Sequence, residues 1–66
     1  MTERRQFLTE PEAAAYLGIS HVCLKKHRLD GIGPAYIRLS PRLIRYEKQD
    51  LDEYIASCRI RGSQNG

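Results

Sequence analysis

The sequence predicts a small, mainly helical domain that carries one short β-hairpin. Three observations lead to this fold class. Two short helical patterns follow each other with only a glycine-containing turn between them, two strand-like runs flank a basic tip, and an amphipathic pattern closes the chain. The 66 residues suit one domain, because a chain of this length buries only about 60% of its unfolded surface. We expect the domain to span residues 7–58, between a flexible segment at 1–6 and a disordered tail at 59–66.

The first helix is predicted over residues 10–17. Thr9 and Glu12 have the spacing of a capping box, in which each side chain accepts a hydrogen bond from the backbone N–H of the other residue. Gly18 follows as the residue that commonly adopts a left-handed conformation at a helix end. Both ends of this helix are therefore specified by local sequence.

The second helix is predicted over residues 21–29. Ser20 is its N-cap, while Ile19 and Leu24 occupy the two positions of a hydrophobic staple. Asp30-Gly31 ends it. Two short helices joined by a turn of about three residues are typical of a helix-turn-helix, although two core helices of an αα-corner have the same pattern.

Residues 35–39 and 43–46 have the composition of two strands, because aliphatic and aromatic side chains alternate there with basic ones. A last helix is predicted over residues 50–58, from the i, i+3, i+4, i+7 spacing of Leu51, Tyr54, Ile55 and Cys58. We expect the Cys58 thiol to be buried, since it completes this apolar stripe. Three acidic residues fall in the predicted first turn, where the helix dipole favours them: Asp50, Asp52 and Glu53.

The order helix, turn, helix, hairpin, helix is that of a small winged helix-turn-helix, in which the hairpin forms a two-stranded wing. Its second helix fits the major groove of DNA, and the wing reaches an adjacent groove or the backbone. The charge distribution along the sequence also favours binding to DNA. Residues 20–45 hold six Lys or Arg and one Asp, a charge of +5, whereas residues 46–56 hold one Lys and four acidic residues, a charge of −3. Such segregation is expected of a protein that binds double-stranded DNA, the alternative being a solvated basic face.

The geometry of the second helix selects candidate DNA contacts. With Leu24 toward the core, steps of about 100° per residue place Val22 and Lys26 on the opposite face. Lysine bonds guanine or phosphate, and valine contacts a thymine methyl, although adjacent lysines on a helix also serve solubility alone. The predicted DNA-binding residues of this helix and its N-cap are Ser20, His21, Val22, Cys23, Lys25, Lys26 and Arg28.

The wing supplies three more candidates, Arg38, Arg42 and Arg45. Alternation places Tyr36 with Arg38 on one strand face, opposite the aliphatic face of Ile37. We expect one face to pack on the helices and the other to carry arginine to solvent. Arg42, at the tip, is best placed for a phosphate or the minor groove. Arg45 either contacts DNA or pairs with an acid such as Asp50.

No enzyme, cofactor, metal site or small-molecule substrate is expected. The sequence has no Ser-His-Asp set, P-loop or paired-carboxylate motif, and Gly31-Ile32-Gly33 lacks the third glycine of a dinucleotide fingerprint. His21 and Cys23 diverge on a helix, so they do not start a metal site. No apolar run approaches the roughly 18 residues of a membrane span. The first five residues lack the apolar region of a signal peptide, so we expect a cytoplasmic protein without a membrane partner.

The chain resembles the excisionase and AlpA-type, MerR-like winged helix-turn-helix proteins over roughly residues 7–56. The opening of that family is matched by Leu8-Thr9, Glu12-Ala13-Ala14, Tyr16-Leu17-Gly18-Ile19-Ser20 and Leu24. Its wing and closing helix are matched by Gly33-Pro34-Ala35-Tyr36-Ile37, Arg45-Tyr46 and Asp50-Leu51-Asp52-Glu53-Tyr54. The chain departs from the family at Cys23, where threonine is common, at His27, where tryptophan is common, and at Ser40-Pro41, where the wing turn is often glycine-rich.

The resemblance implies a recombination directionality factor, which performs no chemistry. Such a protein binds tandem sites beside an attachment site, bends the DNA and helps an integrase to excise. Because no coiled-coil heptads are present, we expect a monomer that assembles side by side on DNA. Two alternatives remain: a small transcriptional regulator of a phage or mobile element, and a protein-interaction module that binds an acidic partner through its basic face.

Overall fold

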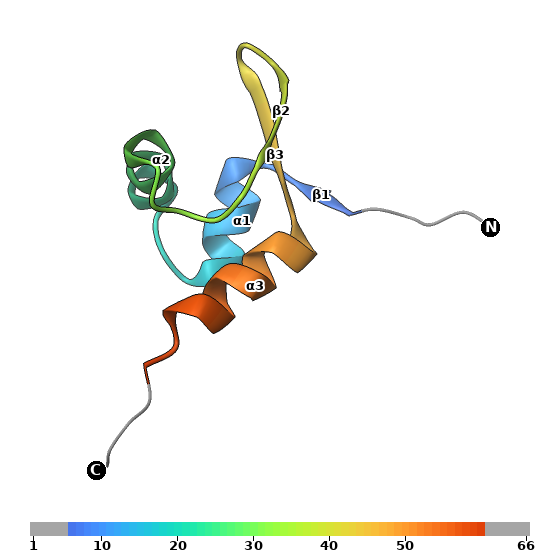
Figure 1. Ribbon diagram of the computed structural model, residues 1–66. Coiled ribbons are helices and arrows are strands. Elements are labelled where there is room, and N and C mark those ends of the chain that lie inside the picture. The colour runs from blue at the N-terminus through green and yellow to red at the C-terminus, as the bar shows by residue number, and fades with distance from the viewer. Residues whose placement is uncertain (1–5, 61–66) are drawn as a thin grey trace, which may run out of the picture.

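The structure is a winged helix-turn-helix, as the sequence predicts (Figure 1). The computed structural model describes residues 6–60. The elements, in chain order, are β1 (Phe7–Leu8), α1 (Glu10–Leu17), α2 (His21–Asp30), β2 (Ile37–Ser40), β3 (Leu43–Glu47) and α3 (Lys48–Cys58). Most of the two segments predicted to be flexible or disordered, at 1–6 and 59–66, lies outside the described residues. Strands β2 and β3 form the wing, which projects beyond the helices on the side away from α3 (Figure 1).

The predicted caps of α1 and α2 are confirmed. The Thr9 N–H donates to Glu12 Oε1 at 2.9 Å, and the Glu12 N–H donates to Thr9 Oγ1 at 3.3 Å, which completes the capping box. Ser20 Oγ accepts from the Cys23 N–H at 3.1 Å. Gly18 and Gly31 end the two helices in the left-handed conformation, with φ of 78° and 75°. Local sequence therefore sets the helix-turn-helix corner.

The sheet has a third strand that the sequence did not predict. β1 pairs with β3 antiparallel, so the strand order is β1-β3-β2. With only two residues, β1 has no periodic pattern of its own. The wing register pairs Ser40 with Leu43 and shifts between Arg38 and Ser40, so Leu39 is an extra residue in a bulge.

Helix α3 begins two residues earlier than predicted. Glu47 is its N-cap without a side-chain capping bond, and Asp50 alone of the three predicted acidic residues lies in the first turn. The prediction that Asp52 and Glu53 also lie there is wrong. The reason is that β3 passes directly into the helix, so tertiary pairing rather than a capping signal fixes the start.

The core is small and is shared by all three helices and the sheet. Its fully buried residues are Ala13, Ala14, Leu24, Tyr46 and Leu51. The wing packs on it through the face of Tyr36 and Ile44, and the Tyr36 ring lies tilted against the Tyr46 ring with 6.1 Å between centroids. The face of Tyr36 and Arg38, not the aliphatic face of Ile37, is therefore the one that packs toward the helices. Arg38 remains exposed beyond Tyr36.

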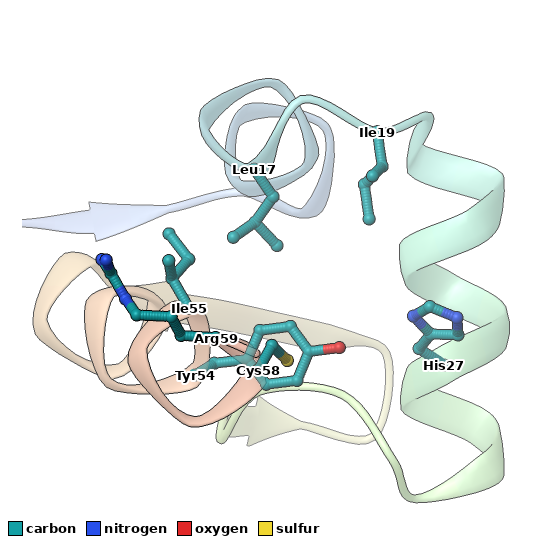
Figure 2. A pocket seen from close by; sticks show the side chains of 7 residues that line it. All are labelled: Leu17, Ile19, His27, Tyr54, Ile55, Cys58 and Arg59. Atoms are coloured by element: carbon teal, nitrogen blue, oxygen red, sulfur yellow. The ribbon is translucent and has the colours of Figure 1, made fainter. Parts of the chain in front are cut away.

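The predicted burial of Cys58 is wrong, because its side chain is exposed. It lies with Ile55, which is 40% exposed, on a shallow apolar groove of about 330 Å³. Figure 2 shows Leu17 and Ile19 above this groove, the residues of α3 below it, and the Tyr54 hydroxyl directed toward α2. Along the α3 stripe Leu51 is buried and Tyr54 half-buried, whereas Ile55 and Cys58 are exposed, so the described residues leave the second half of the stripe largely uncovered. Over residues 6–60, no helix has the length and apolar character that crossing a membrane requires.

Candidate nucleic-acid interface

Helix α2 presents an exposed stripe on the face opposite Leu24. Val22 is 65% exposed and the Lys26 side chain 75% exposed, and Lys25 lies beside them in solvent. The predicted orientation of these three residues is confirmed. Lys26 Nζ lies 3.6 Å from Asp30 Oδ2, but an exposed pair one turn apart contributes only about 0.3–0.5 kcal/mol. The lysine is therefore available to another anion.

The N-terminal turn of α2 contains residues in two different settings. His21 is exposed at the first position of the helix. The Ser20 oxygen is used as a cap, yet its O–H proton remains free to donate. Cys23, on a flank of the helix, is half-buried, and its sulfur lies 4.0 Å from His27 Nε2. No group of three or more His, Cys, Asp or Glu side chains within residues 6–60 is arranged to hold a metal ion.

Arg28 is held by Glu10 of α1. Its Nε donates to Glu10 Oε2 at 2.8 Å and its Nη2 to Oε1 at 3.3 Å, and its Cζ lies 5.7 Å from the centroid of the Tyr36 ring. The Tyr46 hydroxyl donates to the same Glu10 Oε2 at 2.9 Å. One carboxylate thus connects α1, α2 and β3. A DNA contact by Arg28 stays a prediction, but its guanidinium already has a structural role.

This network shifts the pKa values of its members. Burial alone would raise the pKa of Glu10, but the hydrogen bonds from Arg28 and Tyr46, with the Arg28 charge, outweigh it and lower that pKa. Burial, followed by the hydrogen bond to Glu10, raises the pKa of the Tyr46 hydroxyl strongly. The Glu10 hydrogen bond also raises the pKa of Arg28. The carboxylate and guanidinium are therefore both charged at neutral pH.

The three wing arginines line one polar recess of about 290 Å³ between the wing and the start of α1. Arg38 Nη1 donates to the Pro41 carbonyl at 3.0 Å, and Arg45 Nη1 to the Ile44 carbonyl at 2.7 Å. Arg42, at the wing tip, is exposed. The expected alternative pairing of Arg45 with Asp50 is not among these bonds. The structure therefore places Arg38, Arg42 and Arg45 along one recess that the wing forms with the start of α1.

A family model described as a helix-turn-helix domain matches residues 7–59. The chain belongs to this family. The family includes AlpA-type and excisionase-type proteins. The helix-turn-helix domain matches no curated protein sequence.

Leu29 of α2 is an exposed residue that the sequence did not single out as a candidate contact. Leu29 is 68% exposed and lies seven residues after Val22, which places it on the same stripe. An aliphatic residue within a helix is usually assigned to the core, and this is why composition did not select it. Its i+7 spacing from Val22 is the signal that identifies it.

Proposed function

We propose that this helix-turn-helix domain is a sequence-specific, excisionase-like DNA-binding protein that promotes excision by an integrase. The observation that carries the proposal is the exposed stripe of α2 beside a wing that holds three arginines. Membership of the helix-turn-helix family supports DNA binding. The similarity to excisionases supports the narrower role.

In this proposal α2 enters the major groove with its exposed stripe against the bases. Val22 and Leu29 contact thymine methyl groups, while Lys25 and Lys26 bond guanine or phosphate oxygens. Ser20 and His21 contact the backbone at the groove entrance. Cys23, on a flank of the helix, and Arg28, which Glu10 holds, contact the DNA at the edge of this stripe in the proposal.

The wing carries Arg42 toward the minor groove or the neighbouring phosphates. Copies of the protein bound side by side at tandem sites bend the DNA near an attachment site. The bend brings the attachment site into the arrangement that the integrase needs for excision. We propose that the protein acts in the cytoplasm of a bacterial cell or of a phage-infected bacterial cell. No surface of the described residues is assigned to the integrase.

The proposal is tested by a gel-shift titration on genomic DNA from the neighbourhood of the coding sequence, with random competitor DNA present. A ladder of cooperative complexes on a fragment beside an attachment site, with bending in a circular-permutation assay, is the expected result. A single complex on a promoter fragment would instead indicate a transcriptional regulator. No complex at low salt would favour a module that binds an acidic protein.

Two single variants test the docking geometry. Lys26→Ala and Arg42→Ala should each weaken specific DNA binding and leave thermal stability nearly unchanged, because both side chains are exposed. Lys48→Ala is the matched control, since Lys48 is equally charged and exposed but lies at the start of α3. Binding that survives both changes would show that α2 and the wing do not face the DNA.

A further inference from the structure

Two matching pairs of side chains, one on each helix, lie at the groove between α2 and the end of α3. On α2, Cys23 lies four residues before His27, and its sulfur is 4.0 Å from His27 Nε2. On α3, Tyr54 lies four residues before Cys58, and both line the groove together with His27. Residues four apart on a helix lie on the same side of it. The two cysteines of the chain are therefore directed toward one groove.

The Tyr54 hydroxyl is the point at which the two pairs meet. Figure 2 shows it extending across the groove toward α2, where His27 lies. Burial raises the pKa of Tyr54, and a hydrogen bond with Cys58 and the charges of Cys58 and Cys23 raise it further. Because charge effects are largely screened beyond about 10 Å, both sulfur atoms lie near this one hydroxyl.

The two thiols differ in how easily a molecule from solution reaches them. Both are free, but Cys58 is exposed whereas Cys23 is half-buried. The last turn of α3 is weakly held, since Ala56, Ser57 and Cys58 are all exposed and its end is capped by one bond of 3.3 Å, from the Arg59 N–H to the Ala56 carbonyl. A disulfide requires its two Cα atoms to lie within about 7 Å of each other. This exposed turn is the part of the groove that can move to meet that requirement.

We propose that Cys23 and Cys58 form a reversible disulfide by exchange with a small disulfide such as oxidised glutathione. The exposed Cys58 thiolate attacks one sulfur of the small disulfide, and a mixed disulfide forms. The small thiolate that leaves takes up the proton that Cys58 has lost.

The second step closes the bond between the helices. Cys23 passes its proton to His27 Nε2, and the Cys23 thiolate attacks the Cys58 sulfur. The second small thiolate leaves and takes the proton from His27. Two protein thiols are thereby oxidised to one disulfide, and one small disulfide is reduced to two thiols. Disulfides inside cells are usually transient and redox-sensing, which suits a bond that ties α2 to α3 only under oxidising conditions.

The test equilibrates the purified protein, without DNA, against mixtures of reduced and oxidised glutathione, and alkylation with mass spectrometry counts the thiols. The wild type should become a monomer that has lost two hydrogens and has no thiol left to alkylate. Its melting temperature should rise by roughly 8–16 °C, because the bond restricts the unfolded chain. Cys23→Ser should instead stop at a mixed disulfide with one glutathione, and Cys58→Ser should react more slowly, since its remaining thiol is half-buried.

A matched control moves the exposed thiol by one residue. Cys58→Ser combined with Ser57→Cys keeps two thiols, and Ser57 lies in the same exposed turn without lining the groove. This double variant should need a higher ratio of oxidised to reduced glutathione to close its disulfide. Closure at the wild-type ratio would overturn the proposal, because the geometry of the groove would then not matter. A wild type that ends with glutathione on both cysteines, or as a dimer linked through Cys58, would also overturn it. None of these outcomes depends on DNA binding.

Discussion

Replacing Glu10 by glutamine should destabilise the domain by about 2 kcal/mol, although the residue lies at the first position of a helix. Removing one partner of a fully buried ion pair costs about 3–5 kcal/mol, because the other charge is left without a partner. Here the Arg28 side chain is 12% exposed and the glutamine carbonyl still accepts one bond, so the cost is smaller. For a domain of this size, the melting temperature should fall by roughly 8–16 °C.

The hydrogen bond between the Tyr46 hydroxyl and Glu10 can be measured in a double-mutant cycle. Tyr46→Phe keeps the buried ring and removes one donor to Glu10, which should cost about 1 kcal/mol. In the Glu10→Gln background the same change should cost much less, because the charged acceptor has already been lost. The expected coupling energy in the double-mutant cycle is about 1 kcal/mol.

Thermal and urea unfolding followed by circular dichroism measure these quantities. Glu12→Gln is the matched control: Glu12 is an exposed carboxylate in the same helix, and glutamine still completes the capping box, so the change should be within about 0.5 kcal/mol. A Glu10→Gln effect as small as that of Glu12→Gln, or additive single changes, would refute the idea that one carboxylate joins α1, α2 and β3.

The folded-state pKa of Glu10 lies below its ordinary 4.5, so its contribution to stability is complete above that pH and is lost as the pH falls through the folded pKa; acid unfolding of Glu10→Gln should show a shallower dependence on pH below about 4.5. Leu24→Ala, in the centre of the core, should cost about 3 kcal/mol in urea unfolding, and a loss below about 1 kcal/mol would contradict its burial. Gly31→Ala should cost about 1 kcal/mol through backbone strain alone, because nothing lies within 4 Å of the added methyl; a neutral result in thermal unfolding would contradict the left-handed cap. The hydrogen bond to Asp52 raises the pKa of Tyr16, so Asp52→Asn should lower that pKa toward 10.0 in an alkaline absorbance titration, with Tyr16→Phe as the reference and an unchanged pKa as the contrary result.

The sequence predicted those features whose cause is local. The caps at Thr9 and Ser20 lie three residues from their partners, and the outward face of α2 follows from helical spacing once Leu24 is placed inside. Strand β1 was not predicted because its partner β3 lies far along the chain. The early start of α3 was not predicted because its N-cap, Glu47, makes no side-chain capping bond and the helix continues directly from β3.

The candidate site shows the same division between local and distant causes. Sequence could list the basic residues of the wing, but it could not separate Arg28 from them, because its partner Glu10 lies 18 residues away. The amphipathic stripe of α3 was assigned to the core, yet Ile55 stays 40% exposed, since two short helices and a small sheet do not supply enough surface to cover it.

Glu10 connects the stability of the domain to the geometry of its proposed DNA-binding surface. Its carboxylate fixes Arg28 of α2 and Tyr46 of β3, and the Tyr36 ring beneath Arg38 packs on the same tyrosine. The distance between the recognition helix and the wing therefore depends on one ion pair in addition to the apolar core. A core truncation such as Leu24→Ala reduces the fraction of folded molecules. Loss of Glu10 also frees Arg28 beside the wing arginines, and so changes the surface that we propose to meet the phosphate backbone. After correction for the unfolded fraction, the Leu24 variant should keep the wild-type salt dependence of DNA binding, and the Glu10 variant should not.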